Sequence, residues 1–113
     1  MTAIAYKDKD VESYESLVRM CAAEAMGTNP PVAAIPVEVT ITAYFQIAET
    51  RKKGKNRLEE NQPHLQKPDE DNIKKGIKDG MESVVYVNDC IVWKATCTKR
   101  WSATPRAEVT VDY

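Results

Sequence analysis

The chain has 113 residues, of which 42% are hydrophobic, and 16 Lys and Arg residues nearly balance 17 Asp and Glu residues to give a formal net charge of -1. This composition fits one compact soluble domain over residues 1–113, and it excludes a membrane protein because no apolar run approaches the roughly 20 residues that span a bilayer. Taken alone, the balanced charge also argues against a nucleic-acid partner, since proteins that bind phosphate backbones are usually basic.

The amino end and the cysteines indicate the cellular context. Charged residues at positions 7–10 interrupt the start of the chain before a signal-peptide core can form, so we expect a cytoplasmic protein. An odd number of cysteines without a C-x-x-C motif disfavours both a disulfide framework and a cysteine zinc site. The cysteines are Cys21, Cys90 and Cys97.

The first element in chain order is a helix over Asp8–Ala25, where apolar residues recur at spacings of three and four. Asp8 or Asp10 can cap its start, and Gly27 supplies its end. Apolar and polar residues then alternate over Pro36–Ile47, and this period of two predicts a strand.

The polar stretch Glu49–Lys67 is predicted to be a long mobile loop, with five basic residues crowded into positions 51–57. A second helix is predicted over Asp71–Met81, where Asp69 or Asp71 can serve as the N-cap. The residues of this helix that are expected to face the core are Ile73, Ile77 and Met81.

The carboxyl-terminal part of the chain predicts two strands. Alternation over Cys90–Trp101 places one set of residues on a buried face, namely Ile91, Trp93, Ala95 and Cys97. Ala107–Tyr113 alternates in the same way, and the short link Ser102–Pro105 predicts an antiparallel hairpin between these two strands. The expected fold class is therefore α+β, with a small mixed β-sheet packed against two main α-helices.

Carboxylates around the second helix are the candidates for chemistry. Asp69 and Asp71 flank a bend at the start of that helix and Asp89 precedes the next strand, so the three side chains can converge on one point. Oxygen ligands of this kind suit Mg²⁺ or Mn²⁺ and do not suit zinc. Lys75, one turn after Asp71, can hold a phosphate or stabilise charge on a leaving oxygen. The alternative explanation is plain N-capping and complementarity to the helix dipole.

The same region resembles a known family. K-P-D-x-D-N-I-x-K-x-x-x-D-G-M, followed by V-Y-x-N-D-x-x-V, is similar to the motifs of the RusA family of Holliday junction resolvases, and the detailed match covers Lys67–Val92. The resemblance implies a RusA-like domain in which Asp69, Asp71 and Asp89 are catalytic, metal-binding aspartates and Lys75 is an essential lysine. Two further motif residues would have supporting roles, Asn72 and Asp79.

The resemblance also implies a mode of action. The family acts as a homodimer that uses Mg²⁺, for which Mn²⁺ can substitute, to nick two symmetric strands of a four-way DNA junction during recombination and repair. The only histidine, His64, lies outside the motif, and the implied metal-assisted hydrolysis needs no histidine base. The family's frequent occurrence in prophages makes a prophage origin an expectation.

Departures from the family pattern leave alternatives open. Asn88 stands where the family usually has an aspartate, and Ile91 stands where a glutamine is usual. The segment Thr2–Tyr6 is expected to lack the family's amino-terminal strand and loop. A catalytically weakened or inactive dimeric junction-binding protein is therefore one alternative, and a metal-dependent nuclease without junction preference is another.

Basic residues provide the candidate DNA-binding surface. Trp101 is expected to be open enough to stack on an unpaired base, whereas Trp93 is expected in the core. The candidate DNA-binding residues are Arg51, Lys52, Lys53, Lys55, Arg57, Lys67, Lys75, Lys99 and Arg100. Because an acidic metal site would face these basic residues, the charge is segregated, and a net charge of -1 does not exclude a nucleic-acid partner.

Overall fold

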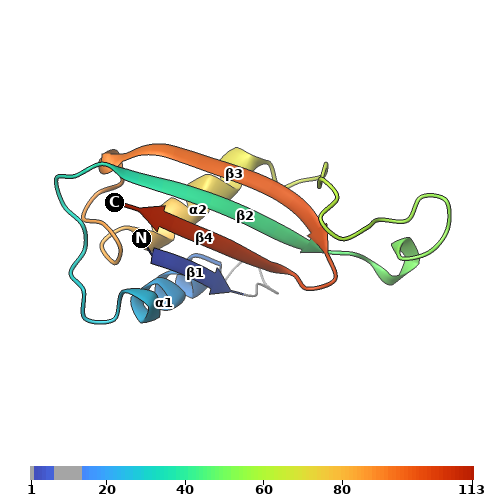
Figure 1. Ribbon diagram of the computed structural model, residues 1–113, viewed down its shortest axis with the longest axis horizontal. Helices are drawn as coiled ribbons and strands as arrows, with labels where there is room; N and C mark the ends of the chain where they lie inside the picture. Colours follow the sequence, from blue (N-terminus) through green and yellow to red (C-terminus); the bar gives the residue numbers. More distant parts are fainter. Residues whose placement is uncertain (1, 7–13) are drawn as a thin grey trace.

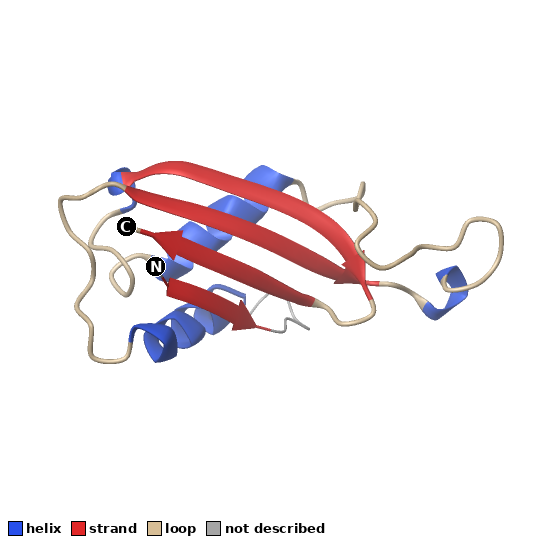
Figure 2. Cartoon of the chain, in the orientation of Figure 1, coloured by secondary structure: helices blue, strands red, loops and turns tan. Residues whose placement is uncertain are grey.

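The computed structural model describes residues 2–6 and 14–113, and it places two helices behind a four-stranded sheet (Figure 1). The elements are β1 (Thr2–Tyr6), α1 (Tyr14–Met26), β2 (Val37–Gln46), the 3-10 turn η2 (Glu49–Arg51), α2 (Glu70–Met81), the 3-10 turn η3 (Asp89–Ile91), β3 (Val92–Ser102) and β4 (Arg106–Asp112). The strands lie in the order β1-β4-β2-β3. Both helices cover the same face of the sheet (Figure 2), which confirms the α+β fold class.

The core lies between the sheet and the helices. On β2 the predicted alternation is confirmed, because Val37, Val39 and Ile41 are fully buried while Thr40 is exposed. Apolar residues from the other elements complete the core, among them Val18, Ala22, Ile73, Ile77, Met81, Val109 and Val111. The three residues predicted to face inward from α2 are all among them.

The helix ends follow the sequence signals where the structure describes them. Gly27 adopts φ 57°, and its amide donates to the carbonyl four residues earlier at 3.0 Å, which ends α1. Asp69 is the N-cap of α2, since its Oδ1 accepts a hydrogen bond from the Asn72 amide at 3.0 Å. The predicted caps Asp8 and Asp10 lie outside the described residues. Neither described helix is long and apolar enough to cross a membrane.

β3 and β4 do not form the predicted hairpin. β3 pairs in parallel with β2, and β4 pairs antiparallel with both β2 and β1, so β2 lies between β3 and β4. Neighbouring strands are about 4.8 Å apart, so residues 103–105 cross about 10 Å, which is within reach of a short extended link. The prediction was wrong because a link of this length serves a hairpin and a step over one strand equally well.

Trp93 is 67% exposed, so its predicted place in the core was wrong. Val92 pairs with Val37 and Lys94 pairs with Glu38, which leaves Trp93 as the extra residue of a β-bulge. A bulge breaks the alternation of inward-facing and outward-facing side chains along a strand. The alternation that holds for Ala95 and Cys97, after the bulge, therefore does not apply to Trp93. Sequence alternation gave no sign of this interruption.

The amino-terminal strand that the sequence was expected to lack is present. Thr2–Tyr6 forms β1 and pairs antiparallel with β4, from Thr2 opposite Val111 to Tyr6 opposite Ala107. Five residues are too few for a periodic signal, and the partner strand lies at the other end of the chain. This strand is therefore a product of long-range pairing that local patterns do not reveal.

The segment that follows β2 projects beyond the sheet, and we call residues 48–60 the arm (Figure 1). It confirms the long polar connection predicted before α2, with η2 as a short turn at its start. The molecule is accordingly elongated, with extents of 51 × 23 × 22 Å. Because β2 and β3 are parallel, both end at the base of the arm.

Candidate functional site

The amino-terminal end of α2 presents several of the predicted site residues. Asp69 caps the helix, and Asp71 lies in its first turn with its side chain 84% exposed. Lys74 Nζ lies 3.4 Å from Asp71 Oδ1, while Lys75, the predicted essential lysine, is exposed at the next position. An ion pair this exposed contributes little to stability, so it leaves Asp71 accessible to a ligand.

Three carboxylates gather at the other end of α2, and we call Asp79, Glu82 and Asp89 the acidic group. Each offers one carboxylate oxygen, and these oxygens all lie within 4.8 Å of one another. All three side chains are half-buried, unlike that of Asp71, which is 84% exposed. Among the described residues, the acidic group is therefore where a cation would meet several ligands at once.

Contacts of the main chain hold the acidic group in place. Arg19 of α1 donates from its guanidinium to the Asp79 carbonyl at 3.1 Å and to the Glu82 carbonyl at 2.9 Å, which satisfies carbonyls at the end of α2. Asn88 caps η3, because its Oδ1 accepts from the amide two residues later at 2.9 Å. This cap places Asp89 as the first residue of the turn.

The acidic group also acts on a buried tyrosine. Tyr86 is fully buried, and its hydroxyl donates to the Lys78 carbonyl at 2.7 Å. Burial raises the pKa of Tyr86, and the charges of Asp89, Glu82 and Asp79 raise it further. The tyrosine therefore remains neutral and hydrogen-bonded, with its pKa raised chiefly by burial and further by the three nearby carboxylates.

The donors of the acidic group fit a hard divalent cation. Three carboxylate oxygens match the ligand preference of Mg²⁺ and Mn²⁺, whereas zinc sites are usually built from His and Cys. Like charges at this spacing repel one another, and a bound cation would relieve that repulsion. The end of α2 is thus a potential acidic metal site.

The predicted convergence of Asp69, Asp71 and Asp89 is not seen within this chain. Asp89 joins the acidic group, whereas Asp69 and Asp71 lie at the opposite end of α2. The helix rises 1.5 Å per residue, so the eight positions from Asp71 to Asp79 correspond to about 12 Å along its axis. One ion cannot be bound directly at both ends.

Glu82 is the acidic residue that the sequence analysis missed. Its signal is the spacing of three residues from Asp79, which places both side chains on one face at the end of a helix. Asp89 reaches this end because the chain turns at Ser83, with φ 72°, and is then fastened to Val32 by backbone hydrogen bonds of 2.8 and 2.9 Å. Such a turn after the helix is not visible in the periodicity.

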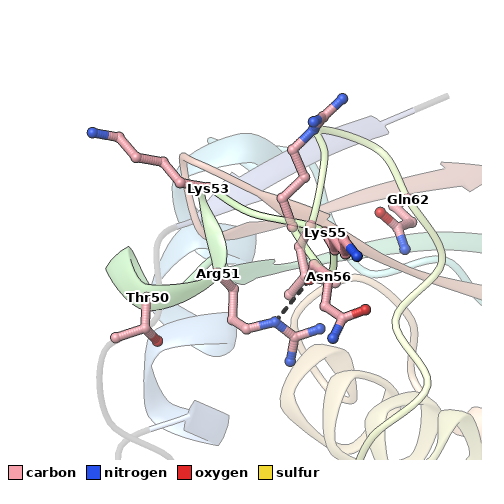
Figure 3. Close-up of a pocket in the computed structure, with 8 residues that line it drawn as sticks. Thr50, Arg51, Lys53, Lys55, Asn56 and Gln62 are labelled. Carbon is pink, nitrogen blue, oxygen red and sulfur yellow. Dashed lines mark hydrogen bonds between the residues drawn. The ribbon is translucent and has the colours of Figure 1, made fainter.

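The arm carries a basic pocket of about 700 Å³ (Figure 3). Its lining consists of Thr50, Arg51, Lys53, Lys55, Asn56, Arg57, Leu58 and Gln62. Arg51 Nε donates to the Asn56 carbonyl at 3.0 Å, which closes the loop on itself. The crowding of basic residues predicted from the sequence is thus a concave surface, not a line of scattered charges.

Acidic neighbours engage part of the charge of the arm. Glu49 lies 2.7 Å from Lys52 Nζ, and Glu59 lies 3.1 Å from Arg57 Nε. Within the described part of the chain Lys53 and Lys55 form no ion pair, and Figure 3 shows Lys53 extending away from the ribbon. These two lysines therefore carry positive charge that is available to an anionic partner.

Lys99 and Arg100 are already engaged by the protein. Lys99 Nζ donates to the carbonyls of Gln66 and Pro68 at 2.7 and 2.9 Å, and Arg100 donates to the Asn61 carbonyl at 2.8 Å. Both cations thus fasten the segment that follows the arm to β3. Of the other predicted DNA-binding residues, Lys67 and Lys75 are exposed.

The two tryptophans differ in exposure from the prediction, because Trp101 is the less exposed of the two. Trp101 is half-buried, with its ring 4.5 Å from the ring of His64, and Phe45 stacks on His64 at 3.9 Å. His64 is only 5% exposed, and its Nδ1 has no hydrogen-bond partner among the described residues. Burial lowers the pKa of His64, and the charge of Lys99 lowers it further. Trp93 is the tryptophan that faces solvent.

Comparisons with known proteins identify a family and a relative of this chain. The family model described as "Endodeoxyribonuclease RusA" matches residues 1–112. "Uncharacterized protein YqaN" of Bacillus subtilis (strain 168) is 30% identical over 80 residues, which cover 67% of this chain and 56% of that protein. The chain thus matches little more than half the length of that relative.

Proposed function

Because the chain belongs to the RusA family of endodeoxyribonucleases, we propose that it is a Mg²⁺-dependent Holliday junction resolvase that acts as a homodimer in DNA recombination and repair. It would hydrolyse phosphodiesters by symmetric paired nicks in four-way DNA junctions, and Mn²⁺ would substitute for Mg²⁺. The observation that carries the proposal is a group of three carboxylates, within 4.8 Å of one another, in a chain that the family model matches almost throughout.

Asp89 is proposed as a ligand of the ion because it belongs to both the family motif and the acidic group. Its partners by proximity are Asp79 and Glu82. The motif also names Asp69 and Asp71, which would instead hold an ion at the amino-terminal end of α2, apart from Asp89. When bound, the ion supplies an activated water and offsets the charge of the scissile phosphate. Lys75 is proposed to stabilise the charge that develops on the phosphate and the leaving oxygen.

The two sets of ligands can be separated by metal titration. We expect Glu82→Gln to weaken Mn²⁺ binding by about tenfold or more if the acidic group is the site, because one of three charged donors is lost. Asp71→Asn would then leave the affinity nearly unchanged. The reverse pattern would assign the ion to the amino-terminal end of α2 and reject the acidic group. Calorimetric titration of each variant with Mn²⁺ measures the affinity without any DNA.

The arm is proposed as the main DNA-binding surface. Its basic pocket suits a track of backbone phosphates, and such contacts supply affinity without reading sequence. The residues proposed to contact DNA are Arg51, Lys52, Lys53, Lys55, Arg57, Lys67 and Lys75. A homodimer would present two arms and two sites related by a two-fold axis, as symmetric nicking of two strands requires.

The departure at Asn88 does not favour an inactive protein. Asn88 caps η3 and thereby positions Asp89, so it has a structural role for which an amide is as suitable as a carboxylate. Ile91 packs partly buried against the core, where a polar side chain would need a hydrogen-bond partner. Both departures are thus accounted for by local structure, and neither removes a carboxylate of the acidic group.

The proposed function is tested with a four-way junction and a linear duplex of equal sequence. Each substrate is incubated with the purified protein, with and without Mg²⁺ or Mn²⁺, beside Asp89→Asn. Glu24→Gln, which alters an exposed carboxylate on α1, serves as the matched control. We expect paired nicks on the junction alone, dependent on the metal, lost in Asp89→Asn and kept in Glu24→Gln.

Other outcomes would reject the proposal in distinct ways. Junction binding without cutting under any metal would identify an inactive junction-binding protein. Equal cutting of junction and duplex would identify a metal-dependent nuclease without junction preference. Sedimentation of the protein as a monomer at the concentrations that cut the junction would reject the homodimer.

A further inference from the structure

The segment 61–68 joins the arm to α2 and lies along the outer edge of β3. The Asn61 amide donates to the Trp101 carbonyl at 2.9 Å, and the Trp101 amide donates to the Gln62 carbonyl at 2.8 Å. The His64 amide then donates to the Lys99 carbonyl at 3.1 Å. The segment therefore extends the sheet by a few residues of antiparallel pairing, and it connects the base of the arm to the start of α2.

Aromatic packing fixes the first half of this segment. The His64 ring is 5% exposed and stacks on Phe45 with an interplanar angle of 20°. Trp101 lies against the same ring with an angle of 54°. Because Phe45 and Trp101 are opposite one another on β2 and β3, His64 is anchored to two strands at once.

Lys99 fixes the second half. Its Nζ donates to the carbonyls of Gln66 and Pro68, at 2.7 and 2.9 Å, so two of the three ammonium donors are used within the protein. Pro68 directly precedes Asp69, the N-cap of α2. The two hydrogen bonds thus tie the residue that precedes the N-cap of α2 to β3.

We propose that Lys99 is a positioning residue for Asp69 and Asp71, and that it is not the DNA contact that its charge suggests. It acts through the main chain of residues 66–68, by holding the N-cap of α2 at a fixed distance from β3. The inference rests on the proposed function in so far as Asp69 and Asp71 take part in cleavage. Lys99 has the same charge as the exposed lysines of the arm, but its Nζ differs from theirs because it donates to two carbonyls of the protein.

The first test follows the amides that depend on the cap. The Asn72 amide donates to Asp69 Oδ1 and the Ile73 amide donates to the Asp69 carbonyl. In Lys99→Met we expect both amides to exchange hydrogen about tenfold faster, while amides in the middle of β2 keep their protection. Lys94→Met, which alters an exposed lysine on the same strand, is the matched control and should change neither set.

The second test separates positioning from DNA contact by kinetics. Under single-turnover conditions we expect Lys99→Met to cut the junction about tenfold more slowly, with the junction dissociation constant within about twofold of the wild type. Lys99→Arg, which keeps a cationic donor, should recover most of the rate and of the amide protection. Lys99→Gln gives the same comparison if Lys99→Met does not fold.

The results that would overturn the inference are specific. Unchanged protection of the Asn72 amide in Lys99→Met would show that the two hydrogen bonds of Lys99 do not hold the N-cap of α2. Lys99 would instead be a phosphate contact if Lys99→Met bound the junction more weakly at an unchanged single-turnover rate. The slope of the logarithm of affinity against the logarithm of salt concentration would then be lower by about one. Hydrogen exchange does not require catalysis. If the protein cut no junction, the proposed function would be rejected, and hydrogen exchange would still show whether Lys99 holds the N-cap of α2.

Discussion

At the scale of single residues, Asp69 combines two roles that substitution can separate. Its Oδ1 caps α2 by accepting from the Asn72 amide, and its second, proposed role is that of a metal ligand. Asp69→Ala should lower the free energy of unfolding by about 1 kcal/mol, because the amide loses its partner. Asp69→Asn should leave stability nearly unchanged, since Asn caps as well as Asp. Urea unfolding of the two variants measures the difference.

Activity then reports the second role of Asp69. If Asp69 binds the ion, Asp69→Asn should cut junctions more slowly than the wild type despite normal stability. Equal stability of Asp69→Ala and wild type would contradict the cap. Equal cleavage by Asp69→Asn would leave capping as its role, which is the alternative that the sequence alone does not exclude.

His64 gives the protein a defined dependence of stability on pH. Its ordinary pKa of 6.5 is lowered in the folded state by burial and by Lys99, so the unfolded chain binds more protons between the two values. The stabilising contribution is therefore complete above about pH 6.5 and is lost as the pH falls through the lower folded pKa. His64→Phe keeps an aromatic ring beside Phe45 and Trp101 but does not titrate.

The measurement is the free energy of unfolding in urea at about pH 7.5 and about pH 5.5. The wild type should lose more stability on acidification than His64→Phe, while carboxylates contribute equally to both. An identical loss in the two proteins would refute the assignment to His64. A polar substitution such as His64→Gln should destabilise at both pH values, because the site is enclosed by rings.

Side-chain roles were predictable where they depend on local sequence. A cap at Asp69 or Asp71 was predicted from their place before a periodic segment, and the structure selects Asp69. The basic surface of the arm was predicted from its composition. Glu82 was missed because its partners Asp79 and Asp89 meet only after the turn at Ser83. The engagement of Lys99 depends on a contact across 31 residues, which no local pattern reveals.

At the scale of elements, β2 is the strand on which the fold depends. It pairs with β3 on one side and with β4 on the other, and Ile41 at its centre is fully buried. Ile41→Ala should lower the free energy of unfolding by about 2–5 kcal/mol through lost burial and a residual cavity. Trp93→Ala, at the exposed bulge, should cost less than about 1 kcal/mol.

Chemical denaturation of these two variants at equal protein concentration provides the comparison. A large loss in Trp93→Ala would indicate that this tryptophan is covered in solution, for example by a second copy of the chain. A small loss in Ile41→Ala would contradict the central place of β2. The contrast is informative because sequence alternation placed both residues in the core.

Elements with strong periodicity were predicted well, and pairings were not. β2 and α2 have clear periods, and their bounds lie within a residue or so of those predicted. β1 was missed because five residues carry little period, and the partner of β3 was misassigned because a short link does not specify adjacency. Strand order depends on contacts between distant segments, and these are not encoded in any one of them.

At the scale of the whole molecule, the arm and the acidic group lie at opposite ends of β3. η3 directly precedes this strand of 11 residues, and the arm begins beside its last residue. At about 3.3 Å per residue the two features are about 36 Å apart, which corresponds to about ten base pairs of DNA. If the protein binds DNA as proposed, one copy of the chain would contact a duplex over about one helical turn.

This span predicts the footprint of the protein on a junction. If the acidic group holds the ion, phosphates contacted by the arm should lie about ten base pairs from the nick, as ethylation interference would map. Replacing both Lys53 and Lys55 by Ala should remove that interference without moving the nick. It should also lower the slope of the logarithm of affinity against the logarithm of salt concentration by about two. Contacts of the arm adjacent to the nick would instead place the ion near Asp71.

The parallel pairing of β2 with β3 means that a long segment separates two neighbouring strands in the sequence. Parallel neighbours need a crossover, and this one, residues 47–91, contains the arm, α2 and the acidic group. Gly54 lies within it, exposed and with open space beside its Cα, and a cut there yields fragments 1–54 and 55–113. β2 would belong to the first fragment while both of its partner strands belong to the second. The two fragments would then reassemble through the pairing of β2 with β3 and β4, and the proposed nuclease activity would measure their complementation.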